Sequence, residues 1–255
     1  MAVNESARQD LFLATPWMNA SGTLGFLPPP RWSFPAEMGA FITNPISLRP
    51  RHPARERAVL EYPGGFLLHS GLPNPGLRAC LNRFAARWAK SSLPTWLHLL
   101  VQNPSEAREM AQAVEGLDGV MVLEIGIPSD LPGKDAIEMV SAACAELPVV
   151  LNLPLNRAGE DWLGLLPSTG VSAISLGAPR GALLLDQSTL LHGRLYGPAL
   201  LPLALGAVIS LQRLAIPVIA AGGIYSVSDG EALLSAGACA VQVDAALWKP
   251  WINLL

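Results

Sequence analysis

The sequence is poor in charged residues, aromatic residues and cysteine. Only 15% of its 255 residues are charged and 6% are aromatic, and the formal net charge is −3. Without an excess of lysine and arginine, the chain lacks an electrostatic footprint for nucleic acid, and we expect no such partner. The three cysteines lie far apart and lack the spacing of metal ligands or of a disulfide framework. We therefore expect buried thiols and no metal site.

The chain also lacks the hydrophobic signals of membrane and secreted proteins. No uninterrupted apolar run reaches the roughly 20 residues of a membrane-spanning helix, and Pro198, Pro202 and Gly206 break the longest candidate, residues 195–214. The first residues, MAVNESARQD, do not follow the basic, apolar, small-residue order of a secretory signal. These absences predict a cytoplasmic protein that does not enter a membrane.

What the sequence does contain is an alternation of short apolar runs and helical patterns. Eight runs have the length and composition of buried strands: residues 14–19, 40–44, 95–101, 119–126, 148–153, 171–177, 217–221 and 239–244. Helical patterns occupy residues 76–89, 105–115, 134–146, 198–213 and 228–236. Eight parallel strands in about 250 residues predict one (β/α)8 TIM barrel spanning residues 1–255. An open doubly wound sheet is the alternative, and the lack of a GxGxxG motif after the first strand disfavours it.

The segment at residues 216–244, IPVIAAGGIYSVSDGEALLSAGACAVQVD, is the most informative one. A short apolar strand ends at Gly222 and Gly223, and Ser226 or Ser228 can cap the helix that follows. A glycine pair at the carboxyl end of a barrel strand can bind phosphate through backbone N–H groups. A plain turn between strand and helix is the alternative interpretation.

Polar residues stand at or just after most of the predicted strand ends. They are Asn19, Ser21, Asn44, Glu124, Asn152, Ser175 and Asp244. In a barrel these ends meet at one rim, where the active site is built. The pattern therefore predicts a pocket for a small-molecule ligand at that rim.

Several segments, taken in this order, resemble the dihydroorotate dehydrogenases. They are TPWMNASGTLG (15–25), FITNPISLRPR (41–51), HSGLPNPGL (69–77), GRLYGPALLPLAL (193–205) and the AAGGI…GACAVQV segment, which together cover nearly the whole chain. The resemblance implies an FMN-dependent barrel of pyrimidine biosynthesis. In that family FMN binds at the strand ends, a base removes one proton from dihydroorotate, and a hydride passes to the flavin.

The positions that carry this family's chemistry differ here. The catalytic Cys or Ser of the family falls on Ile127, which cannot accept a proton, and a family Asn falls on Glu124. Two family lysines fall on Asn44 and Asn152, and the Gly-Thr pair at the phosphate falls on Asp244 and Ala245. The family Asn of the NSxGLPN segment falls on Leu68, and a substrate-side Asn becomes Ser175.

These replacements predict a site that disfavours bound anions and the oxidation of dihydroorotate. Two lost lysines and two added carboxylates change the formal charge by about −4, and one pair of unit charges 4 Å apart is worth about 4 kcal/mol at an effective dielectric of ~20. Such a change disfavours a reduced anionic flavin, an orotate carboxylate and a flavin phosphate. Loss of the base costs about 10²–10⁴-fold in rate. Oxidation of dihydroorotate itself is therefore not expected.

The resemblance still assigns residues to a site. The expected FMN ligands are Ala20, Ser21, Asn44, Asn152, Ser175, Arg194, Gly197, Gly222, Gly223, Asp244 and Ala245, and the expected substrate ligands are Asn19, His69, Asn74 and Tyr196. Residues 193–197 are predicted to form a turn in which Arg194 pairs with Asp244 at the phosphate position. A solvated Arg194 at the loop rim is the alternative.

Glu124 and Asp130 are the candidate acid–base groups. Glu124 at a buried strand end should have a raised pKa if it is unpaired. Asp130, just past Ile127, could replace the lost base, although a turn-forming aspartate in Pro-Ser-Asp is the plainer interpretation.

Three functions remain open at this point. The first is an FMN-binding oxidoreductase with an altered substrate, and the second is a non-catalytic barrel that binds a ligand or a partner. The third is a flavin-free enzyme that uses Glu124 as acid and base. The final segment, WKPWINLL, predicts a thin last helix whose apolar residues are covered by a second subunit, so we expect a homodimer.

Overall fold

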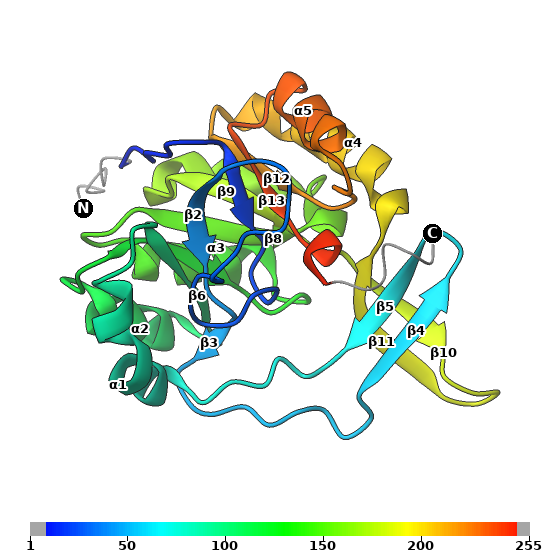
Figure 1. Cartoon of the computed structure of the whole chain (residues 1–255), viewed down its shortest axis with the longest axis horizontal. Helices are drawn as coiled ribbons and strands as arrows, with labels where there is room; N and C mark the ends of the chain where they lie inside the picture. The colour runs from blue at the N-terminus through cyan, green and yellow to red at the C-terminus, as the bar shows by residue number, and fades with distance from the viewer. Residues whose placement is uncertain (1–8, 249–255) are drawn as a thin grey trace.

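The computed structural model describes residues 9–248, and within them eight parallel strands close into a barrel (Figure 1). In order around the barrel they are β1 (Trp17–Asn19), β2 (Met38–Ile42), β6 (Thr95–Leu100), β7 (Val120–Gly126), β8 (Val149–Pro154), β9 (Ala173–Gly177), β12 (Val218–Ala221) and β13 (Ala240–Val243). The ring closes because β13 pairs with β1 and β2 pairs with β6. All eight predicted strands are present, so the predicted (β/α)8 fold is confirmed.

Helices cover the outside of the barrel at the five predicted places. They are α1 (Leu77–Trp88), α2 (Pro104–Val114), α3 (Gly133–Ala143), α4 (Leu201–Leu211) and α5 (Val227–Ser235). Local sequence sets their starts: the Asn103 side chain accepts from the Glu106 N–H at α2, and Ser226 and Asp229 form a capping box at α5. The remaining coverage consists of 3₁₀ turns: η1 (Leu155–Arg157), η2 (Asp161–Thr169), η3 (Pro198–Leu200), η4 (Gln212–Leu214) and η5 (Ala245–Leu247).

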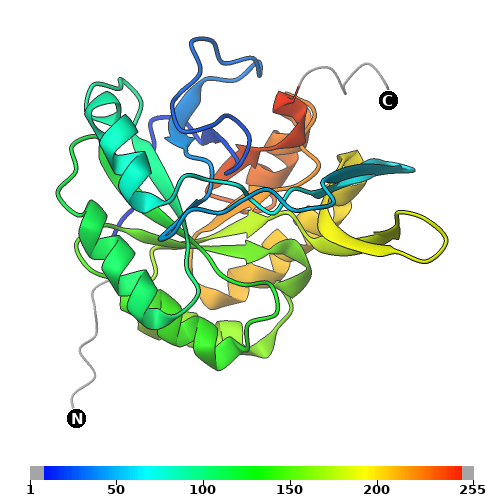
Figure 2. The ribbon, with the colours of Figure 1, turned by 90° about the horizontal axis from the view of Figure 1, so that it is seen from below.

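A second, antiparallel sheet was not predicted. It consists of β4 (Ala58–Tyr62), β5 (Gly65–His69), β10 (Arg180–Leu184) and β11 (Leu190–Tyr196), paired in the order β10-β11-β5-β4. Figures 1 and 2 show this small sheet projecting from one side of the barrel. A separate short strand, β3 (Ile46–Ser47), pairs with β6 of the barrel. The prediction of a turn at residues 193–197 is wrong, because Arg194 and Tyr196 belong to β11. The sheet escapes sequence analysis because its two hairpins come from distant segments with mixed polarity.

The barrel interior is layered. Its floor is a cluster of buried apolar side chains that includes Met18, Ile42, Trp96 and Val150. Above this floor lies a layer of polar side chains near the strand ends: His98, Glu124, Asn152, Ser175 and Gln242. Because side chains on a strand alternate between faces, the neighbours of these polar residues, such as Leu97 and Ile125, pack outward against the helices.

Other expectations from the sequence meet the structure with mixed results. Within residues 9–248, no helix combines the length and apolar character needed to cross a membrane. Cys80 is buried, but Cys144 is half-buried and Cys239 is exposed, so the prediction of buried thiols is correct for Cys80 only. The N-terminal segment and the predicted helix in WKPWINLL lie largely outside the described residues.

Candidate functional site

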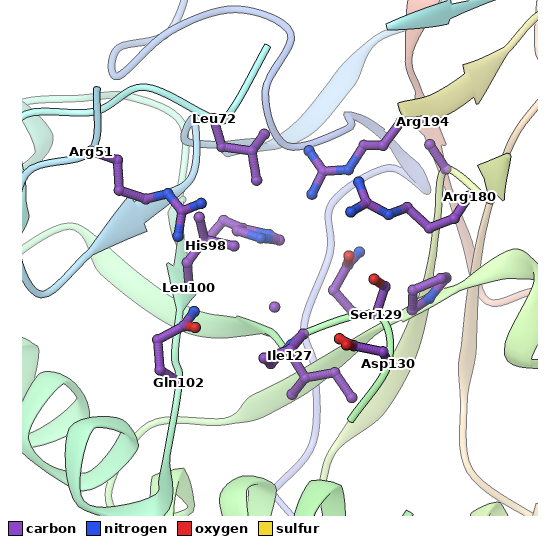
Figure 3. Close-up of a pocket in the computed structure, with 15 residues that line it drawn as sticks. Arg51, Leu72, His98, Leu100, Gln102, Ile127, Ser129, Asp130, Arg180 and Arg194 are labelled. Carbon is purple, nitrogen blue, oxygen red and sulfur yellow. The ribbon is translucent and has the colours of Figure 1, made fainter. Parts of the chain in front are cut away.

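Two neighbouring cavities open at the carboxyl ends of the strands. The larger, about 220 Å³, is called the arginine cavity here because Arg51, Arg180 and Arg194 line it (Figure 3). The smaller, about 40 Å³, is called the inner cavity and includes Ser21 and Asp244 in its wall. His98, Asn152, Ala178 and Arg194 line both. The predicted pocket at the strand ends is therefore present, divided into two compartments.

Glu124 is the centre of the polar layer between the strands. Its Oε2 lies 2.6 Å from His98 Nδ1, and its Oε1 accepts from Ser175 Oγ at 2.6 Å and from Gln242 Nε2 at 2.7 Å. Asn152 Nδ2 extends the network by donating to Ser175 Oγ at 3.0 Å. Burial acts to raise the pKa of Glu124, but the hydrogen bonds and the nearby His98 outweigh it, and the pKa is lowered. The raised pKa considered for an unpaired Glu124 therefore does not apply, because the carboxylate is paired and acts as an acceptor.

His98 is the functional candidate that sequence analysis missed. It lies directly opposite Glu124 in the β6–β7 pairing, and its side chain is only 3% exposed. Its Nδ1 faces the Glu124 carboxylate, whereas its buried Nε2 has no hydrogen-bond partner among the described residues. A titratable residue inside the otherwise apolar run TWLHLL was the available sequence signal.

The arginines give the larger cavity a positive charge. Arg180 and Arg194 are directly paired across β10 and β11, and Figure 3 shows Arg51 on the opposite side of the cavity. Burial and the charge of Arg194 both lower the pKa of Arg180, while Asp130 raises it. Three arginines and one aspartate give the lining a formal charge of +2 with His98 neutral. The predicted loss of positive charge at the site is thus offset by arginines that sequence analysis had not assigned, Arg51 and Arg180.

Asp244 does not form the predicted ion pair with Arg194. The ion pairs within the described part of the chain do not include it, and Asp244 Oδ1 instead accepts from the Ala245 N–H at 2.5 Å. Burial raises the pKa of Asp244 to about 6, and the hydrogen bond from Ala245 partly opposes this. A buried carboxylate therefore holds a backbone N–H at the position where the resemblance places a phosphate.

Gly222 and Gly223 form the turn that joins β12 to the segment before α5. Gly222 and Gly223 have φ values of +106° and +79°, a backbone region that residues other than glycine rarely adopt. A Cβ at Gly223 would overlap the backbone nitrogen of Leu201, whereas a Cβ at Gly222 would meet nothing closer than 3.7 Å. Both glycines are buried and line neither cavity, so the turn packs closely against Leu201 at Gly223 and against apolar side chains at Gly222.

Three asparagines proposed for the site have their side chains engaged with the backbone. Asn19 exchanges two hydrogen bonds with Ile42 across β1 and β2, and Asn44 Oδ1 accepts from the Gly25 N–H. Asn74 Oδ1 accepts from Ser47 and from the Gly76 N–H, and its Nδ2 donates to the Leu72 carbonyl. Asn74 thereby holds Leu72, which lines the arginine cavity in the left-handed conformation (φ 54°).

The remaining expected ligands lie around the inner cavity, with exceptions. Ala20, Ser21, Tyr196 and Asn152 line it. Gly197 and Ala245 are buried and line neither cavity. Ser175 also lines neither, and its hydroxyl donates to Glu124. His69 Nδ1 lies 2.7 Å from the carbonyl of His192 in the small sheet, away from both cavities.

The loop after β7 faces the arginine cavity. Half-buried Ile127, at the family's base position, lines the cavity together with Ser129 and exposed Asp130. Figure 3 shows Asp130 and Ser129 on the wall below Arg180. Ile127 offers no proton acceptor, and the titratable side chains other than arginine in this cavity's lining are His98 and Asp130.

Together, fold and site define a (β/α)8 barrel with two cavities at the carboxyl ends of its strands. No family model matches the chain. It is 31% identical over 260 residues to the dihydroorotate dehydrogenase B (NAD(+)) catalytic subunit of Geotalea daltonii, covering 92% of this chain and 84% of that protein. The like-named subunit of Pelobacter propionicus is 30% identical with the same coverage, and that of Pyrococcus furiosus is 29% identical over 82% of this chain and 75% of that protein. The chain belongs to the dihydroorotate dehydrogenase family, which places it with the flavin-dependent oxidoreductases.

The residues present fit an FMN molecule only in part. Ser21 and Asn152 line the inner cavity and offer polar groups to a flavin ring. Gly222 and Gly223, the expected phosphate ligands, are buried and line neither cavity, and the side chains of Leu155, Leu200 and Ala204 lie beside Gly222. Two further features oppose FMN binding. The inner cavity, at about 40 Å³, is smaller than a flavin ring system, and Asp244 places a buried carboxylate at the expected phosphate position.

Proposed function

We propose that the protein is a flavin-dependent oxidoreductase of the dihydroorotate dehydrogenase type whose substrate is a small organic anion other than dihydroorotate. The observation that carries the proposal is the arginine cavity. Arg180 and Arg194 are held directly opposite each other on paired strands, an arrangement that like charges disfavour. An anionic ligand between them removes that repulsion, and none of the ion pairs of the described residues involves either arginine.

Dihydroorotate is a poor fit to this site. The family's base position is Ile127 and its lysine positions are Asn44 and Asn152. The side chain of Asn44 binds the backbone of Gly25, outside both cavities. These residues supply neither the proton acceptor nor the cations on which the family's reaction depends.

FMN, when bound, supplies the chemistry of hydride acceptance. Ser21 and Asn152 are the residues that would hold its ring. Asp244 makes this binding dependent on pH, because a buried carboxylate with a pKa of about 6 is charged at neutral pH and repels a phosphate. FMN affinity should therefore rise as the pH falls below about 6.

A second candidate is a barrel that binds an organic anion without redox chemistry. The specific observation in its favour is the narrow inner cavity together with Asp244, which already accepts the Ala245 N–H. A flavin-free enzyme that uses Glu124 itself as acid and base is disfavoured, because both carboxylate oxygens are engaged by His98, Ser175 and Gln242.

The visible absorption spectrum of the purified protein, followed by FMN titration at pH 5.5 and pH 7.5, separates the two candidates. Asp244→Gly is the matched variant, since it restores the family's glycine. The oxidoreductase proposal predicts a flavin band, with tighter FMN binding at the lower pH and pH-independent binding in Asp244→Gly. A colourless protein that ignores FMN in both forms refutes it and supports the non-redox candidate.

Two expectations from the sequence stay predictions. They are the homodimer and the cytoplasmic location. Light scattering on a gel-filtration peak tests the dimer, and a monomer mass would contradict it.

A further inference from the structure

We propose that His98 exchanges a proton with a dicarboxylate bound in the arginine cavity, and that Glu124 is its positioning residue. This inference rests on the proposed anion site but requires no flavin.

The first argument is the fixed geometry of the pair. Glu124 Oε2 lies 2.6 Å from His98 Nδ1, and the other carboxylate oxygen is held by Ser175 and Gln242. Contacts on both oxygens therefore fix the orientation of the carboxylate. A carboxylate acceptor at Nδ1 places the imidazole proton on Nδ1 and leaves a lone pair on Nε2. The lowered pKa of Glu124 keeps it anionic, so it also stabilises the imidazolium ion formed when Nε2 takes up a proton.

The second argument is the state of Nε2. A histidine with a purely structural role usually satisfies both ring nitrogens, and a buried polar atom left without a partner costs about 1–3 kcal/mol. His98 Nε2 is buried and has no partner among the described residues, yet His98 lines both cavities. Gly126 keeps the space beside it clear, because a Cβ at that residue would come within 2.5 Å of Nε2.

The class of ligand follows from where the cations lie. Figure 3 shows Arg180 and Arg194 on one side of the arginine cavity, Arg51 on the other, and His98 between them. A ligand with an anionic group at each end would contact both sets of guanidinium groups and place its middle carbon atoms near His98. A dicarboxylate with an acidic C–H bond between its ends meets both requirements.

The proton-transfer step is balanced without an oxidant. A C–H bond next to a carbonyl group of the ligand breaks, and the proton goes to His98 Nε2. The electron pair stays on the ligand and delocalises into the carbonyl as an enolate, which the arginines stabilise. The charged groups that surround this step are Glu124 on β7, Asp130 after β7, Arg180 and Arg194 on the small sheet, and Arg51 after β3.

The experiment measures binding and proton exchange separately. Calorimetry with succinate, malate and 2-oxoglutarate reports the anion site, and NMR in D₂O reports the loss of the C3–H signal of 2-oxoglutarate. We expect the wild type to bind 2-oxoglutarate and to accelerate this exchange over buffer. His98→Gln should bind it within about threefold but lose about 10²–10⁴-fold in exchange rate. His52→Gln, at an exposed histidine that lines neither cavity, is the matched control and should exchange like the wild type.

Two further variants keep the test decisive. Gly126→Ala puts a Cβ 2.5 Å from Nε2 without removing a titratable group, so the His98 ring must shift and exchange should also be lost. Glu124→Gln should lower the exchange rate and shift its pH profile, which a merely structural residue would not do. Binding of 2-oxoglutarate without exchange, or exchange unchanged in His98→Gln and Gly126→Ala, overturns the role of His98. Failure of all three dicarboxylates to bind the wild type overturns the anion site instead.

Discussion

Replacing Glu124 by glutamine should destabilise the protein substantially, although the two side chains have nearly the same shape. The carboxylate is fully buried and receives hydrogen bonds from His98, Ser175 and Gln242. Hydrogen bonds to a charged group contribute about 1.5–3 kcal/mol each, against about 1 kcal/mol for neutral pairs. Loss of the charge at three bonds therefore lowers the free energy of unfolding by about 3 kcal/mol, or about 6–12 °C in Tm for a domain of this size.

The effect should depend on pH in a defined direction. The pKa of Glu124 in the folded protein lies below its usual value of 4.5, so the unfolded state binds the proton more readily. The stabilisation is then present above the unfolded pKa and is lost as the pH falls through the folded pKa. The difference between wild type and Glu124→Gln should be largest at neutral pH and shrink below about pH 4.5.

Urea unfolding between pH 4 and pH 8 measures both effects. The matched control is Glu138→Gln on α3, which removes an exposed carboxylate 3.9 Å from Lys134 and should change stability by less than about 0.5 kcal/mol. The reasoning would be refuted if Glu124→Gln had the same free energy of unfolding as the wild type at pH 7 and lost stability in the same way as the pH falls to 4.

Three further predictions concern the rim of the barrel. Asp244→Asn should be more stable than the wild type at pH 8 by up to about 3 kcal/mol and equally stable at pH 4. A raised pKa of about 6 favours folding below the unfolded pKa, and this advantage is lost as the pH rises through 6; equal urea midpoints at pH 8 would contradict it. Gly223→Ala should lower the Tm more than Gly222→Ala, since only a Cβ at Gly223 meets the backbone of Leu201; a scanning fluorimetry ranking in the reverse order would count against this. Arg180→Gln should leave the apo Tm unchanged or raised, yet weaken dicarboxylate binding at least tenfold, and calorimetry with unchanged affinity would argue against the anion site.

The barrel itself could be predicted because its signals are local. Each strand is a continuous apolar run, and each helix has its own pattern and in two cases a recognisable cap, as at Asn103 and Ser226. The small sheet could not be predicted in the same way. The pairing of β5 with β11 joins residues more than a hundred positions apart, and no local pattern specifies that register.

The candidate site was predictable in part for the same reason. Polar residues at strand ends placed Asn152 and Asp244 correctly in the cavity walls, whereas Glu124 lies in the buried polar layer and lines neither cavity. The sequence did not identify the partners that decide their chemistry. The sequence alone leaves open whether Glu124 is paired, because no local pattern specifies the strand register that sets His98 opposite it. Likewise, Arg180 and Arg51 line the cavity through the small sheet and the loop after β3, whose placement depends on pairings between distant segments.

The calorimetric titration of a dicarboxylate into the wild type and into the double variant Arg180→Gln/Arg194→Gln tests the central claim most directly. The account predicts binding by the wild type that weakens as salt is added, because charge attraction drives it, and a loss of at least tenfold in the double variant. The same affinity in both proteins, or no binding by the wild type at low salt, would contradict the claim that the arginine cavity is an anion site.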